Sequence, residues 1–96
     1  MKISELKPGM RRVDITAKVL ELSESRDVTT RAGEASRVAT AVVTDDSGTV
    51  KLTLWNEQID QVGVNDTVMI ENGYVTSFRG ETQLNVGRYG KLTVQK

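Results

Sequence analysis

Residues 37–55, RVATAVVTDDSGTVKLTLW, decide the fold of this chain. Apolar and polar residues alternate on both sides of DDSG, which is the period of a β-strand with one buried face. The Asp and Gly residues of DDSG suit a tight turn. The stretch therefore predicts a β-hairpin whose second strand buries Val50, Leu52 and Leu54.

The chain's single tryptophan, Trp55, falls on the opposite face of that strand, beside Lys51 and Thr53. Counting from an inward Val75, which is out of phase with Val68 and Ile70, turns Tyr74 and Phe78 outward. A small domain normally buries aromatic rings, each of which can cover about 150–250 Å². For one ring, a wrong strand phase or a second small core would explain the pattern. Three outward rings together favour a platform on which unpaired bases stack.

The remaining pattern is mostly β. Residues 13–22 alternate as a long first strand, and residues 23–36 form a polar loop in which Gly33 suits a hairpin tip. Residues 56–63, NEQIDQVG, predict a short helix with Asn56 as N-cap and Gly63 at its end. Beyond it, Asn72-Gly73 is either a bulge in one bent strand or a hairpin turn.

The composition limits the possible functions. The chain has 96 residues, 13 basic and 13 acidic, with no cysteine and no histidine. Cys-type zinc sites, thiolate nucleophiles and the commonest general base are therefore absent. Asp45-Asp46 belongs to the predicted turn, and no phosphate-binding glycine pattern occurs. We expect one domain over residues 1–96, not an enzyme, with no cofactor, no metal, no signal peptide and no membrane segment.

Basic and polar residues surround the predicted platform. We expect contacts with a nucleic-acid backbone or with polar base edges from Arg26, Arg31, Arg37, Lys51, Thr53, Arg79, Gln83, Asn85 and Arg88. Acidic residues lie among the arginines of the 23–36 segment, so the predicted electrostatic contribution is modest.

Three stretches, LKPGM (6–10), VVTDDSGTVKLTLWNEQ (42–58) and VMIENGYVTSFRGETQLNVG (68–87), carry a family resemblance. Together they resemble the archaeal single-OB-fold single-stranded DNA-binding proteins, which are replication protein A-like. The resemblance implies an all-β fold: a five-stranded OB-fold Greek-key barrel with a short helix between strands 3 and 4. It favours the bulge at Asn72-Gly73, and it implies base stacking at Trp55, Tyr74 and Phe78.

The implied function is sequence-independent binding of single-stranded DNA in replication, recombination and repair, in the cytoplasm and associated with the nucleoid. Many family members continue into a flexible tail that recruits other proteins, whereas this chain ends at KLTVQK. Replication or repair partners recruited in that way are therefore not assigned to these residues. Two alternatives stay open: a protein-interaction subunit with an OB fold, and a binder of single-stranded RNA.

Overall fold

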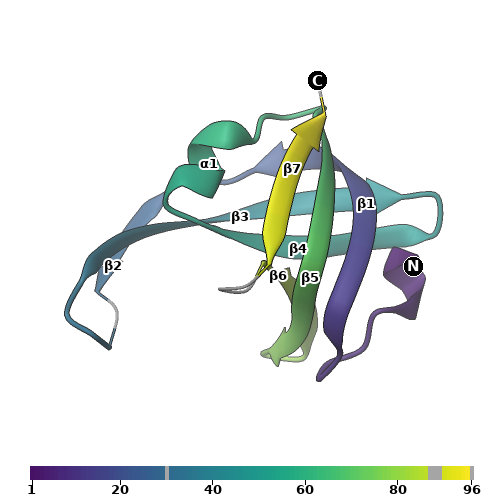
Figure 1. Ribbon diagram of the computed structural model, residues 1–96, viewed down its shortest axis with the longest axis horizontal. Helices are drawn as coiled ribbons and strands as arrows, with labels where there is room; N and C mark the ends of the chain where they lie inside the picture. The colour runs from purple at the N-terminus through teal and green to yellow at the C-terminus, as the bar shows by residue number, and fades with distance from the viewer. Residues whose placement is uncertain (30, 87–89, 96) are drawn as a thin grey trace.

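The computed structural model describes residues 1–29, 31–86 and 90–95 and is built almost entirely from strands (Figure 1). A 3-10 helix, η1, precedes the strands, and one short α-helix, α1, interrupts them. In chain order the elements are η1 (Ile3–Glu5), β1 (Arg11–Leu22), β2 (Arg26–Thr29), β3 (Ala35–Asp45), β4 (Gly48–Trp55), α1 (Glu57–Gln61), β5 (Thr67–Phe78), β6 (Glu81–Asn85) and β7 (Lys91–Gln95).

Strands β1, β3, β4, β6 and β5 follow one another around a barrel, and β5 pairs with β1 to close it. The β4–β6 pair is parallel, and the other pairs are antiparallel. Strand β2 pairs only with β3, and β7 continues the pairing along the first half of β5. The five-stranded OB-type barrel predicted from the sequence is confirmed, with α1 between its third and fourth strands.

Aliphatic side chains fill the barrel at alternate strand positions. The largest fully buried ones are Leu52, Leu54, Ile70, Leu84, Val13, Val19, Val43 and Val68. The inward faces predicted for the 37–55 hairpin and for the first strand are therefore confirmed. Among the residues whose burial is described, this core contains no aromatic ring.

The segment around Asn72-Gly73 is a bulge within the single strand β5, not a hairpin turn. The register against β1 shifts between the pairs Val13–Gly73 and Ile15–Ile70, so β5 carries one extra residue there. Asn72 takes a left-handed φ of 56°. Gly73 is needed for close approach, because a Cβ on it would lie 2.9 Å from the carbonyl oxygen of Asn85.

The sequence predicted a loop over residues 23–36, but this segment contains strand β2. Strand β2 pairs with the first residues of β3, and together they form an arm that projects from the barrel (Figure 1). Gly33, with φ of +81°, lies in the turn at its tip, as predicted. The backbone pairing extends the hairpin well beyond the part that contributes to the core.

Helix α1 lies where it was predicted, but its ends differ. It stops at Gln61, before the expected Gly63, and Asn56 makes no side-chain capping bond. Instead Asn56 has φ of 50°, and its Oδ1 accepts a hydrogen bond from the backbone N–H of Arg37 at 2.9 Å. The amide that was expected to cap the helix therefore ties it to β3.

Candidate nucleic-acid interface

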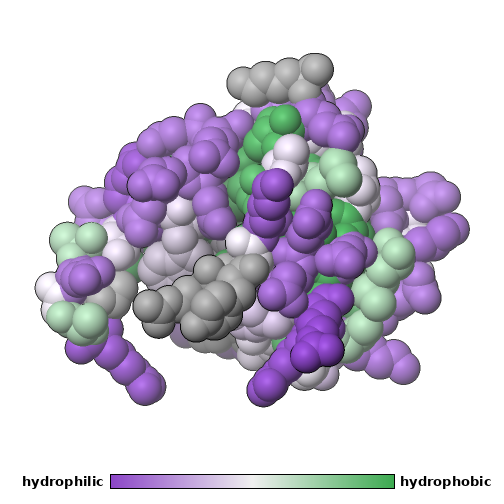
Figure 2. Space-filling view, viewed as in Figure 1, coloured by the Kyte–Doolittle hydropathy of each residue, from purple (hydrophilic) through white to green (hydrophobic). Residues whose placement is uncertain are grey.

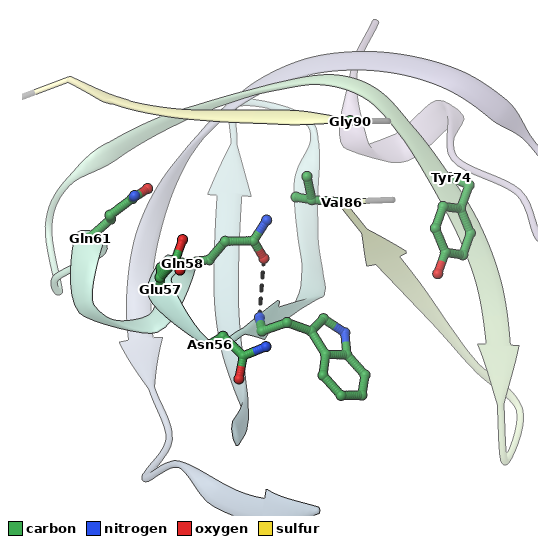
Figure 3. Close-up of a pocket in the computed structure, with 8 residues that line it drawn as sticks. Asn56, Glu57, Gln58, Gln61, Tyr74, Val86 and Gly90 are labelled. Carbon is green, nitrogen blue, oxygen red and sulfur yellow. Dashed lines mark hydrogen bonds between the residues drawn. The ribbon is translucent and has the colours of Figure 1, made fainter. Parts of the chain in front are cut away.

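A cleft of about 490 Å³ opens on the outside of the barrel where β4 runs into α1 (Figure 3). Two aromatic residues line it together with the amide and carboxyl residues of α1 and the asparagine before it. Its lining residues are Trp55, Asn56, Glu57, Gln58, Gln61, Tyr74, Val86 and Gly90. The cleft thus pairs flat apolar faces with hydrogen-bonding groups.

Trp55 and Tyr74 each retain 39% of their surface exposed. Their separation follows from the strand register: Thr53 on β4 lies opposite Asn85 on β6, and Asn85 lies opposite Tyr74 on β5. Two strand spacings, about 10 Å, separate β4 from β5 there, and Trp55 lies two residues, about 7 Å, beyond Thr53, so the backbones of Trp55 and Tyr74 are about 12 Å apart. The outward placement predicted for both rings is confirmed, and the rings line one cleft.

The third predicted ring and one predicted arginine cannot be placed in the same way. The backbone of Phe78 ends β5 opposite Glu81. The side chain of Phe78 and the whole of Arg88 lie outside the described residues. Their roles stay predictions.

The polar positions predicted beside the rings lie on the outer face of β4 and β6. Lys51 lies opposite Gln83, and Thr53 lies opposite Asn85. Asn85 was expected to face solvent, and that expectation is wrong, because only 8% of its surface is exposed. Its Nδ2 donates to Thr76 Oγ1 at 3.0 Å, so the amide is held between the neighbouring strands.

Two of the predicted cations are already paired with carboxylates. Arg37 Nη2 lies 2.8 Å from Asp60 Oδ2, and Lys51 Nζ lies 2.6 Å from Glu81 Oε2. The hydrogen bond from Arg37 to Asp60 lowers the pKa of this carboxyl and raises that of the guanidinium. Both pairs are partly exposed, so solvent screens them and each contributes little to stability.

The other described cations lie away from the cleft walls. Arg26 begins β2 and Arg31 lies near the tip of the arm, and both are exposed. Arg79 is exposed in the turn between β5 and β6, with a left-handed φ of 52°. Figure 2 shows hydrophilic surface around α1, a mixture of hydrophilic and weakly hydrophobic surface on the arm, and hydrophobic strips on the barrel.

Hydrogen bonds fix the backbone around Trp55. Gln58 Oε1 accepts from the Trp55 N–H at 3.1 Å, and the carbonyl of Arg37 accepts from the Asn56 N–H at 2.9 Å. Residues 56–63 predicted a short helix, and four of them, Asn56, Glu57, Gln58 and Gln61, also form a polar part of the cleft lining that the helix pattern did not indicate. The signal was present, since three amide residues and two carboxylates follow the tryptophan within six positions.

No helix within residues 1–29, 31–86 and 90–95 has the length and hydrophobicity needed to cross a lipid bilayer. Over the same residues, no group of three or more His, Cys, Asp or Glu side chains is arranged to hold a metal ion.

Comparison with known proteins points to one family. The chain is 41% identical over 91 residues to the single-stranded DNA binding protein Ssb of Saccharolobus solfataricus, covering 95% of this chain and 61% of that protein. It is 31% identical over 97 residues to replication factor A of Methanothermobacter thermautotrophicus, covering 95% of this chain and 12% of the relative. The chain thus spans less than two thirds of either relative.

Among solved structures, the second OB-fold domain of replication protein A from Methanococcus maripaludis superposes with a TM-score of 0.81 at 26% identity. The match covers 98% of this chain and 92% of that domain. Residues 6–94 match the family model described as single-stranded DNA binding protein Ssb-like, OB fold. The chain therefore belongs to the Ssb-like family of OB-fold single-stranded DNA-binding proteins.

Proposed function

We propose that this domain binds single-stranded DNA, largely without sequence preference, by stacking bases on Trp55 and Tyr74. The observation that carries the proposal is that these two rings, each 39% exposed, line one cleft on the outer face of an OB barrel. Each stacked base contributes about 1–3 kcal/mol, and every base has a π-face. Phe78, four residues beyond Tyr74 on β5, would extend the platform by about 13 Å.

The DNA backbone follows the cations that surround this platform. Arg26 and Arg31 on the arm and Arg79 on the β5–β6 turn are exposed at positions where OB folds engage oligonucleotides. Arg37 and Lys51 take part only when a phosphate displaces their carboxylate partners. Electrostatics is therefore the smaller contribution and stacking the larger one.

The polar groups between the rings have a supporting role. Thr53 and Gln83 are half-buried on the outer face and can hydrogen-bond to base edges or sugars. Asn85, which is buried and bonded to Thr76, shapes the surface under the strand of DNA. Arg88 completes the set as a backbone contact.

A domain that covers unpaired bases without reading their order suits the protection of single-stranded DNA during replication, recombination and repair. The relative from Saccharolobus solfataricus, which carries the name single-stranded DNA binding protein, supports this assignment. Stacking by itself does not discriminate DNA from RNA, because only contacts to the sugar 2′-hydroxyl do so.

Intrinsic fluorescence tests the proposal directly, because Trp55 is the chain's single tryptophan. Titration with an unpaired DNA oligonucleotide should quench the emission, since a stacked base would lie on the indole. A duplex of the same length should quench far less. An RNA oligonucleotide provides a third arm and reports the polymer preference.

Equal responses to single strand and duplex, or no response to either, would remove single-strand recognition. The exposed rings would then be better explained as part of a protein-interaction surface.

A further inference from the structure

The end of strand β4 is held by a side chain that takes the place of a strand carbonyl. Strands β3 and β4 pair up to Val38–Trp55, and the next pair in the same register is Arg37–Asn56. The N–H of Asn56 donates to the carbonyl of Arg37 at 2.9 Å, as in a regular antiparallel ladder. The reciprocal bond is different, because the N–H of Arg37 donates to Oδ1 of Asn56, also at 2.9 Å.

The backbone of Asn56 explains this replacement. Its φ of 50° and ψ of −117° are typical of the first central residue of a type II′ turn. The chain therefore leaves the sheet for α1 immediately after Trp55 (Figure 3). The main-chain carbonyl of Asn56 accepts from Nη2 of Arg37 at 3.4 Å instead of from the N–H of Arg37.

Glycine is the residue that suits this backbone conformation, because it has no Cβ. An asparagine here carries backbone strain, and such strain is often found at functional sites. What asparagine adds is the bond from its Oδ1 to the N–H of Arg37. This bond is exposed, so water could replace Oδ1 with little loss of stability. Its main effect is thus to keep the last pair of β4 closed.

We propose that Asn56 is a positioning residue that holds Trp55 ready for stacking. This inference rests on the proposed stacking function. Trp55 is the last residue of β4, so opening the Arg37–Asn56 pair would let it fray from the sheet. A ring on a fixed backbone loses less freedom when a base binds. The cost of ordering one side chain corresponds to roughly 2- to 10-fold in affinity.

The variant Asn56→Gly removes the strain and the side-chain bond together. In the free protein, the fluorescence anisotropy decay of Trp55 should show a larger amplitude of nanosecond motion. The affinity for an unpaired thymine oligonucleotide should fall roughly 2- to 10-fold. The melting temperature should stay within about 5 °C of the parent's, because relief of strain offsets the lost bond.

Two further variants separate the bond from other effects. Asn56→Asp keeps an oxygen that can accept from the N–H of Arg37, so it should restore the slow decay of Trp55. The decay of the free protein is the measure here, because the added charge changes affinity for a separate reason. Gln61→Ala is the matched control, since it removes another exposed amide of the cleft from the far end of α1. It should leave the decay unchanged.

Several results would overturn the proposal. One is equal motion of Trp55 in Asn56→Gly and the parent, and another is greater motion with unchanged affinity. A melting temperature far below the parent's in Asn56→Gly would make Asn56 a structural residue. Faster motion in Asn56→Asp or in Gln61→Ala, equal to that in Asn56→Gly, would show that the bond to Arg37 is not the cause.

These failures differ from failure of the proposed function. If the parent does not bind the oligonucleotide, stacking on Trp55 is refuted whatever the decay shows. If the parent binds and Asn56→Gly binds equally well, single-strand binding stands and only the positioning role is lost.

Discussion

Substitutions on strand β4 can separate the contribution of the core to stability from that of the outer face to binding. Leu52 and Trp55 lie on opposite sides of this strand. Leu52 is completely buried. Its replacement by Ala should cost about 2–5 kcal/mol of unfolding free energy. A domain of this size loses about 4–8 °C of melting temperature per kcal/mol, so Leu52→Ala should lower the Tm by roughly 8–40 °C.

Trp55→Ala should weaken binding strongly and lower the stability only slightly. Its ring keeps 39% of its surface exposed, so the loss of stability should be clearly smaller than for Leu52→Ala. Loss of one stacked base should weaken single-strand binding by about 1–3 kcal/mol, or roughly 5- to 150-fold. Thermal melts by circular dichroism and anisotropy titrations of a labelled oligonucleotide, below both melting transitions, measure the two effects.

Two results would contradict a separation between the core face and the binding face of β4. Trp55→Ala could melt as low as Leu52→Ala while its folded form binds like the parent, in which case the ring belongs to the core. Alternatively, the folded fraction of Leu52→Ala could lose as much affinity as Trp55→Ala. The two faces of β4 would then not act separately, and affinity would report barrel integrity rather than stacking.

Three further outcomes follow from the contacts. The plot of log affinity against log salt concentration should have a shallow slope, with roughly two to four phosphates neutralised at about −0.7 each. Asp60→Asn or Glu81→Gln should raise the affinity and steepen this slope, because each variant frees a cation; an unchanged slope in both variants would exclude those cations from contact with phosphate. Hydrogen bonds from Ser47, Ile3 and Gly48 lower the pKa of Asp45 to about 2. The Asp45 carboxylate therefore stabilises the fold above its unfolded pKa, and this contribution is lost as the pH falls toward 2. Urea titrations across that pH range should show a free energy of unfolding that depends less on pH in Asp45→Asn than in the parent; an identical dependence would count against this contribution. Gly73→Ala should destabilise the barrel by about 1–3 kcal/mol, because its Cβ would lie within 3.0 Å of two neighbouring atoms, and a melting temperature like the parent's would show that the bulge can relax.

Strands β1 and β4 were predictable from the sequence because buried and more exposed positions alternate along them with a period of two. Leu52 and Leu54 are inward and Trp55 is outward, as counting from Val50 predicted. The turn at Asp45 was predictable because it depends on neighbouring residues. The Asp45 carboxylate accepts hydrogen bonds from the N–H groups of Ser47 and Gly48. Interactions between residues two or three positions apart leave a direct trace in the sequence.

The features that were missed depend on contacts between distant residues. Period-2 counting put Asn85 outward, but only the neighbouring strands show that its amide is covered and bonded to Thr76. The pairing of Arg37 with Asp60 joins residues 23 positions apart on β3 and α1. Charge balance anticipated weak electrostatics, but it did not identify which cations carry a carboxylate partner.

The bulge in β5 links the barrel to its proposed binding surface. With uninterrupted alternation from the buried Val68 and Ile70, position 74 would face the core and Val75 would face outward. The extra residue at Asn72-Gly73 reverses that phase, so Val75 is 2% exposed while Tyr74 is 39% exposed. The close approach of Gly73 to the Asn85 carbonyl, which leaves no room for a side chain, permits this reversal beside Tyr74. The residue that lets β5 bend around the core therefore also turns an aromatic ring toward the cleft, so closure of the barrel and formation of the platform depend on the same irregularity.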